Sequence, residues 1–410
     1  MFQSIAPRFA KSSERHLELR LIASLCALAL LTLGIACRSD SEAQRVRPRQ
    51  LRDVPAQRLA FTFSADIEPP ANASTEEAKP IQAIQEDFDV RRKDEALVLH
   101  RTVTSPDGQR ALALYSEQDE SSTTFHIDLY ASSGTFIRNV TPPDLAVVFQ
   151  DSVLWSADSG YIAFVARKAA QPQASPTPPG LEEPGPLESP VASPTVMPAF
   201  PPLATFSTEQ IYICDKDGYA LKPLTTRDGL IYFALSWAPD GHALSALACK
   251  ESEWDARERE FKTPSGRPRL ITLDGAERLL DDEMAQAPPV WSPDSAKIAT
   301  AFDVDIGIYD ATDKAPTQAR IVLRERMITA SAAFDEKGTA KKSPDQSKPN
   351  TASTPTSGVP VSFNPIVRME WPVPEKLYVQ TGYLDLRNVL PTFSRWHLLT
   401  LSPQAVVLGR

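Results

Sequence analysis

The stretch WSPDSAKIATA, from Trp291 to Ala301, contains the features that decide the fold. Its Pro presets the backbone for the second position of a tight turn, and the following Asp can cap that turn with its own side chain. An apolar run ends at the Trp, and a second apolar run follows the turn. The stretch therefore predicts two buried strands joined by a tight turn.

The same pattern recurs along the chain. Its other copies are SPDG at Ser105–Gly108, WSADSGYIAF at Trp155–Phe164, WAPDGHALSA at Trp237–Ala246 and the degenerate WPVPEKLYV at Trp371–Val379. Asp107 and Asp158 are 51 residues apart, and Asp240 and Asp294 are 54 apart. The steps between these two pairs and from Asp294 to the last copy are longer, because each contains an insertion. Five copies in one order indicate a repeat architecture.

A second hairpin follows most copies. Examples are HIDLYASSGTFIRNVT from His126, QIYICDKDGYALKPLT from Gln210 and RLITLDGAERLL from Arg269. In each, Asp or Ser near a Gly separates two runs rich in strand-forming residues. Four strands per repeat of roughly 40–50 residues are typical of a β-propeller blade, so we predict an all-β protein with four-stranded blades.

The segments Trp291–Ala301 and Ile211–Thr225 resemble the repeat of TolB-like propellers, in which W-S-P-D-G and I-A-F are followed by I-Y-x-x-D-x-D-G and L-T. The resemblance covers about residues 98–410 without the insertions. It implies six blades; because five copies are clear, five or seven remain alternatives. Arg58–Asp66 is a candidate for part of a degenerate sixth blade. Ala96–Val103 is a candidate for the first strand of the first clear blade.

The repeated residues are predicted to be structural. The turn positions are Asp107, Gly108, Asp158, Asp240, Gly241 and Asp294, and the aromatic positions are Trp155, Trp237, Trp291 and Trp371. A ring of equivalent acids could form a catalytic site, but Asp is also the residue that such turns select locally. The Trp side chains are expected to pack between blades rather than to form a ligand cage.

The N-terminal region has the pattern of an export signal. Leu21–Ala36 contains sixteen uncharged residues after a basic stretch, which is short for a spanning helix but suits a secretory signal. Gly34-Ile35-Ala36-Cys37 resembles a bacterial lipobox, which implies a lipid on Cys37, although Gly34 stands where Leu is usual. An uncleaved anchor is the alternative. We predict an anchor segment over residues 1–37, a tether over 38–56 and the propeller over 57–410.

Two insertions interrupt the propeller. Residues 171–203 are rich in Pro, and residues 335–360 are rich in Lys, Ser, Thr and Pro. Neither composition suits a packed core, so both are predicted to be flexible loops. They are either tolerated variation in loop length or arms that bind a partner.

The sequence gives little indication of catalytic or metal chemistry. It has no Gly-x-Ser-x-Gly motif, and its last repeat reaches the C-terminal residues, so we expect no hydrolase domain. None of the five histidines is paired at ligand spacing. Asp215/Asp217 and Asp303/Asp305 could bind calcium, but turn formation explains them and neither extends to a full EF-hand loop. No metal, cofactor or catalytic residue is predicted.

Charge and cysteine content limit the remaining possibilities. The net charge of −9 argues against nucleic acid as a partner, since phosphate contacts need clustered Lys and Arg. Four cysteines are too few for a disulfide scaffold. Cys214 and Cys249 lie on apolar strands of consecutive repeats, either as buried thiols or as a disulfide.

These observations together predict a non-catalytic protein rather than an enzyme. We expect a membrane-anchored, extracytoplasmic propeller, either periplasmic or on the outer face of the membrane, that acts as a scaffold or accessory subunit. Its partner would be another membrane or envelope protein. A solute-binding or sensor propeller is the alternative, followed by an enzyme with its site in the central funnel.

Overall fold

The computed structural model describes residues 50–71, 80–118, 124–168, 209–260, 262–312, 314–340, 360–382 and 394–403. The chain divides into two compact units, residues 1–53 and 54–410. The first unit contributes the 3-10 helix η1 (Leu51–Asp53) to the described residues. All five sheets of the described residues belong to the second unit.

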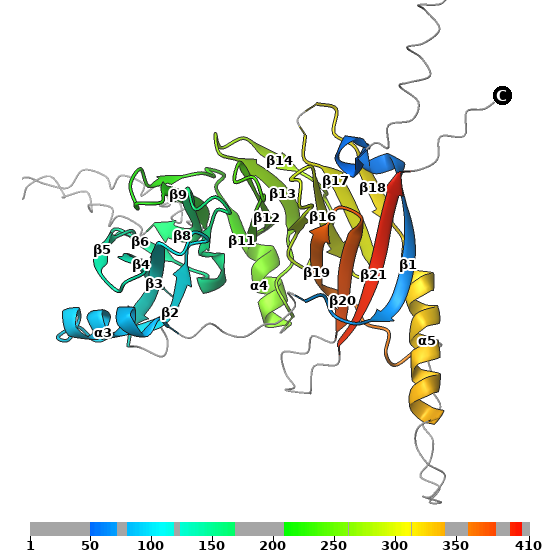
Figure 1. The fold of residues 1–410 in the computed structure, drawn as a ribbon, viewed down its shortest axis with the longest axis horizontal. Coiled ribbons are helices and arrows are strands. Elements are labelled where there is room, and N and C mark those ends of the chain that lie inside the picture. Colours follow the sequence, from blue (N-terminus) through cyan, green and yellow to red (C-terminus); the bar gives the residue numbers. More distant parts are fainter. Residues whose placement is uncertain are drawn as a thin grey trace, which may run out of the picture. The chain divides into compact units, whose positions relative to one another are not determined.

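Each sheet is antiparallel, and four of them follow chain order (Figure 1). The first sheet is β2 (Leu97–Thr104), β3 (Arg110–Glu117), β4 (His126–Ala131) and β5 (Phe136–Asn139). The second is β6 (Leu145–Val147), β7 (Leu154–Trp155), β8 (Tyr161–Lys168), β9 (Gln210–Asp215) and β10 (Lys222–Pro223). Both β6 and β7 pair with β8, and the 3-10 helix η3 (Gln150–Ser152) lies between them in sequence.

The remaining sheets have the same four-stranded form. The third is β11 (Leu230–Trp237), β12 (Ala243–Lys250), β13 (Arg267–Thr272) and β14 (Glu277–Leu279). The fourth is β15 (Val290–Trp291), β16 (Lys297–Phe302), β17 (Asp305–Asp310) and β18 (Gln318–Ile321). The fifth is β19 (Ile366–Val373), β20 (Lys376–Gly382), β21 (Ser394–Pro403) and β1 (Leu59–Ile67). The prediction of a mostly β fold built from four-stranded antiparallel sheets is confirmed, and this arrangement is consistent with a β-propeller.

Helices occupy some of the connections. They are η2 (Ala56–Arg58), α3 (Gln82–Arg91), α4 (Glu251–Arg259) and α5 (Arg324–Ala340). Helix α3 buries Ile84 and Phe88 in a cluster with residues of the first sheet. Helix α5 continues to the first residues of the segment 335–360, which the composition predicts to be flexible. The insertion 171–203 lies outside the described residues.

The core lies between consecutive sheets, because alternate residues of a strand point to opposite faces. On β9, Cys214 packs with the first sheet, whereas Ile211 and Ile213 pack with the third. On β12, Leu247 and Cys249 pack with the fourth sheet instead. The two cysteines therefore lie in different inter-sheet cores and are free thiols. Burial raises the pKa of each thiol to about 12, which keeps it protonated.

The fifth sheet corrects the prediction for Arg58–Asp66. Strand β1 does not form part of a further blade; it pairs along its length with β21, and the two lie side by side in blue and red (Figure 1). The N-terminal strand thus completes a sheet whose other strands come from the C-terminal region. The segment Ala96–Val103 forms most of β2, the first strand of the first sheet, as predicted. The described residues contain five sheets, and a sixth blade stays a prediction.

Buried polar side chains hold the end of β1. Asp66 adopts a left-handed φ of 54° at a bulge in the β1–β21 pairing. Its carboxylate accepts two hydrogen bonds from Arg395, at 2.6 and 3.0 Å, and its backbone N–H donates to Nδ1 of His397 at 3.3 Å. Arg395 also donates to Ser331 Oγ on α5. This network fixes β1 to β21 and to the helix.

A second polar network holds the residues that precede β1. Lys297 Nζ donates to Asp310 Oδ1 at 2.6 Å and to the Val54 carbonyl at 2.7 Å, and all three groups are buried. The Ala56 N–H donates to Asp310 at 3.1 Å. Burial opposes the charged form of Asp310, but hydrogen bonds from Lys297 and Thr317 hold its pKa below the ordinary value. The last residues of the predicted tether are therefore bound to the fourth sheet.

We predict that His397 makes stability depend on pH. Burial lowers the pKa of His397 from 6.5 to about 4. Between pH 6.5 and about pH 4, His397 is therefore protonated in the unfolded chain but neutral in the folded chain. The titration of His397 therefore leaves the free energy of unfolding unchanged above pH 6.5. This free energy falls by on the order of 3 kcal/mol as the pH decreases from 6.5 toward 4.

Urea unfolding at several pH values measures this effect. His397→Gln should lack this component of the pH dependence, whereas the exposed-site control His242→Gln should keep it. Equal slopes in all three proteins would contradict the assignment.

Candidate functional site

The repeated acids serve their own turns. Asp107 Oδ1 accepts hydrogen bonds from Ser105 Oγ at 2.6 Å and from the Gln109 N–H at 3.0 Å. Asp158 and Asp294 make the same pair of bonds in their turns, and Asp240 accepts from the His242 N–H. These carboxylates are engaged locally, so the structure gives no support to a catalytic ring at this position.

Neighbouring turns nevertheless contact each other. The Asp107 N–H donates to Ser159 Oγ of the next sheet at 3.0 Å, and the Asp240 N–H donates to Ser295 Oγ at 3.0 Å. Both serines have a φ of 58°, in the left-handed region where Gly108 and Gly241 lie in the other two turns. A serine is more strained than a glycine at this left-handed position. Its hydroxyl, however, accepts a hydrogen bond from the neighbouring sheet, which a glycine cannot do.

The repeated tryptophans differ in their contacts. Trp155 Nε1 donates to the Val103 carbonyl of the preceding sheet at 3.0 Å, and Trp291 Nε1 donates to the Ser236 carbonyl in the same way at 3.1 Å. Trp237 stacks on Tyr161, with ring centroids 6.4 Å apart, and its Nε1 is buried without a hydrogen-bond partner in the described chain. Trp371 Nε1 donates to Pro374 within its own turn. The first three side chains therefore link consecutive sheets.

We predict that Trp155→Phe destabilises the protein more than Trp237→Phe does. Both changes remove a similar volume, but only the first removes a hydrogen bond between sheets. The difference should be about 1 kcal/mol, measured by chemical denaturation. Equal losses would show that the Trp155 hydrogen bond contributes nothing.

The two calcium candidates are engaged in other contacts. Asp215 Oδ1 accepts from the backbone N–H groups of residues 217 and 219, and Asp217 pairs with Arg110 of the first sheet. Asp303 pairs with Arg324, and Asp305 accepts from the Leu323 N–H. Among the described residues, no group of three His, Cys, Asp or Glu side chains is placed to hold a metal ion.

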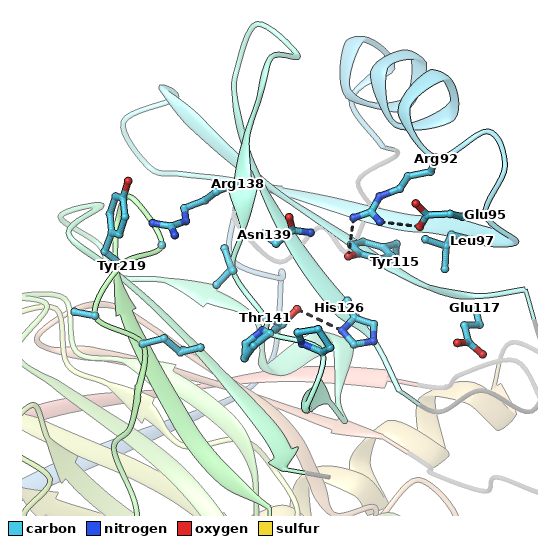
Figure 2. A pocket seen from close by; sticks show the side chains of 16 residues that line it. Arg92, Glu95, Leu97, Tyr115, Glu117, His126, Arg138, Asn139, Thr141 and Tyr219 are labelled. Carbon is cyan, nitrogen blue, oxygen red and sulfur yellow. Dashed lines mark hydrogen bonds and ion pairs between the residues drawn. The ribbon is translucent and has the colours of Figure 1, made fainter.

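One pocket brings residues of the first and second sheets together (Figure 2). Its volume is ≈ 860 Å³, within the range of ligand sites. Its walls come from the end of α3, strands β2 to β5, the loop 140–143 and the turn 218–221 between β9 and β10. We call it the rim pocket, because outer strand β5 and the turn before outer strand β10 form one side of it.

Asp128 on β4 organises the polar wall of the rim pocket. This carboxylate is fully buried, and it accepts hydrogen bonds from Arg91 at 2.7 Å, Arg92 at 3.2 Å and Asn139 at 2.8 Å. Arg92 also pairs with Glu95 at 2.7 Å and donates to the Tyr115 hydroxyl (Figure 2). Asp128 thus holds the C-terminal end of α3 against the first sheet. Its negative charge is shared between the two arginines, so both have a carboxylate partner.

Two titratable side chains of the wall are neutral near pH 7. Burial, with the nearby Asp128 charge, raises the pKa of Tyr115 to about 12. Burial lowers the pKa of His126, and its ring faces the Thr141 hydroxyl at 3.5 Å (Figure 2). The part of the wall that these two side chains form is therefore polar but uncharged.

Arg138 on β5 differs from Arg92. Its guanidinium carbon lies 3.7 Å from the centroid of the Tyr219 ring, toward which it points (Figure 2). Its Nε and Nη1 atoms are buried and have no hydrogen-bond partner among the described residues. Gly218 makes this arrangement possible, because its φ is +73° and a Cβ there would lie 3.2 Å from Arg138 Cδ. The pocket thus contains one cation without a carboxylate partner in the described chain.

Sequence reasoning did not find the rim pocket. Its residues lie in the second hairpins and in α3, outside the repeated turn that dominates the pattern. The D-x-D-G turn at Asp215–Gly218 is explained by the repeat and by turn formation, so the sequence gives no sign that it also forms a wall of the pocket. Cys37, the predicted lipid site, lies outside the described residues. Within the described ranges, no helix has the length and apolar character needed to cross a membrane.

No family model matches the chain, and no curated protein matches it. Solved structures do show a similar fold at low identity. An oligogalacturonate lyase from Vibrio parahaemolyticus is 8% identical over 75% of this chain and 67% of that chain, with a TM-score of 0.34. Prolyl oligopeptidase B from Galerina marginata is 10% identical over 56% and 30%, with a TM-score of 0.35. A dipeptidyl peptidase 4 from Porphyromonas gingivalis is 11% identical over 55% and 33%, with a TM-score of 0.33.

These structures have β-propeller-type folds. The chain spans about a third of the length of the two peptidases, so their activities do not transfer to it. The comparison does correct the prediction that the protein is not an enzyme. The neighbours are peptidases and a lyase, so a propeller repeat gives no reason to exclude catalysis.

We predict that Asp128→Asn destabilises the protein by about 3 kcal/mol, because it leaves two arginines facing a neutral amide in a buried site. The matched control is Asp151→Asn, whose side chain is 98% exposed and pairs with Arg101. That control should not change stability measurably. Thermal and urea unfolding check both variants. A stable Asp128→Asn protein would show that α3 is held by its apolar contacts alone.

Proposed function

We propose that the protein is a TolB-like propeller held at an extracytoplasmic membrane face, and that it binds a membrane or envelope protein through the rim pocket. The lipobox-like sequence at Cys37 supports the anchor. The rim pocket carries the binding part of the proposal. It is the place where two sheets, a helix and two loops expose polar and aromatic groups on one surface.

The chemistry of the pocket suits a polypeptide segment. Its walls combine polar groups with exposed apolar surface, and Tyr219 is 60% exposed although it is a large aromatic residue. Tyr and Arg are enriched at the centres of protein interfaces, where they combine apolar area with hydrogen bonding. The pair of Arg138 and Tyr219 has this character.

A solute-binding propeller is the second candidate. The volume of ≈ 860 Å³ supports it, because this is large enough to hold a small molecule. A protein partner is favoured because the exposed Tyr219 ring lines the pocket at an open edge rather than inside an enclosed cavity.

Photo-crosslinking in the native membrane tests the proposal. We expect a photoreactive amino acid at Pro143, in the pocket wall, to crosslink a defined protein of the envelope. The same group at Val322, which is 60% exposed outside the pocket, is the matched control and should not capture that protein.

Detergent extraction provides an independent measurement. The crosslinked protein should co-purify at a fixed ratio with the unmodified chain and be lost when Pro143→Trp fills the pocket. Capture of the same proteins from both positions, or a chain that purifies alone, would overturn the proposed partner binding.

A further inference from the structure

We propose that Arg138 and Tyr219 form a carboxylate-binding subsite of the rim pocket, which receives an acidic side chain of the partner protein. The inference rests on the proposed function and adds the chemistry by which the partner is recognised. It starts from the two buried nitrogens of Arg138 that have no hydrogen-bond partner among the described residues. Buried donors that lose water without gaining an acceptor are costly, and a bound carboxylate removes that cost.

The nearby acids do not fill this role. Asp217 pairs with Arg110, and Asp215 accepts hydrogen bonds from the backbone of its own turn. Asp128, the buried acid of the same sheet, accepts from Arg91, Arg92 and Asn139. These three acids therefore have partners of their own in the described chain, and we take the acceptor for Arg138 to come from another molecule.

The guanidinium group is also held in place before a ligand arrives. Its plane is supported by the Tyr219 ring at 3.7 Å, and its methylene chain packs on the bare backbone of Gly218. An arginine stacked on an aromatic ring loses less freedom on binding, and its planar fork matches the two oxygens of a carboxylate.

The charge of the pocket favours a carboxylate over a phosphate group. Arg92 is already neutralised by Glu95 and Asp128, so Arg138 supplies the available positive charge. Glu95 and Glu117 also line the pocket. One cation with carboxylates nearby suits a single negative charge, whereas phosphate sites usually gather several cations or backbone N–H groups.

Fluorescence anisotropy with labelled peptides tests the subsite. The probes are acetyl-hexaglutamate amide and the neutral acetyl-hexaglutamine amide. We expect the acidic peptide to bind at least tenfold more tightly than the neutral one, although the protein itself has a net charge of −9. Arg138→Gln should abolish this preference, and Arg138→Lys should restore only part of it.

The matched control is Arg326→Gln. Arg326 lies over the Phe61 ring at 5.0 Å, so it is also an arginine on an aromatic side chain, but it is exposed and outside the pocket. This variant should bind like the wild type. An equal loss in both variants would show non-specific charge attraction and overturn the subsite. An unchanged melting temperature in each variant excludes unfolding as the cause.

Free glutarate distinguishes the source of the carboxylate. If glutarate binds as tightly as the acidic peptide and equally needs Arg138, the subsite serves a solute and the assignment to a partner side chain is wrong. The crosslinking experiment separates the two proposals. A partner that crosslinks at position 143 with equal yield in Arg138→Gln overturns the subsite and leaves the proposed function standing.

Discussion

The structure depends on burying both faces of its central strands. A single four-stranded sheet of this sequence would expose an apolar face, because β3, β12 and β16 are buried along nearly their whole length and β8 is buried from Ile162 to Ala166. Each sheet therefore needs a neighbour on either side. The alternation on β9 and β12, where odd and even residues enter different cores, shows how one strand meets this need. Sheets that follow one another in the sequence therefore pack against each other in the fold.

The polar residues of the repeats refine this packing. Ser159 and Ser295 accept a backbone N–H from the preceding sheet, and the indoles of Trp155 and Trp291 donate to it. Apolar contacts alone permit neighbouring sheets to slide, whereas two directional hydrogen bonds close to the repeated turn do not. The backbone strain at the two serines is thus offset by the hydrogen bonds that they accept, and these bonds fix the distance between neighbouring turns.

Local patterns predicted the repeats because each turn is specified by its own residues. The Pro-Asp and Asp-Gly turns, the alternating strands and the inter-sheet tryptophans all follow from interactions within a few positions or from volume. The place of β1 did not follow, since pairing Leu59–Ile67 with Ser394–Pro403 joins segments more than 300 residues apart. Nor did helix α3, whose apolar face consists mainly of Ile84 and Phe88 and gives only a weak helical pattern.

The candidate site was hidden for a related reason. Arg138, Tyr219 and Asp128 lie in different parts of the sequence. The role of each depends on which charged groups already have a partner in the folded chain. A sequence shows that arginines and acids are present, but the pairing of Arg91 and Arg92 with Asp128, and of Arg110 with Asp217, appears only in space. After these pairs are made, Arg138 is left with an aromatic ring and no carboxylate in the described chain. Arg91, Arg92 and Arg110 each have a carboxylate partner, whereas Arg138 has none among the described residues, so its guanidinium marks the surface where another molecule is expected.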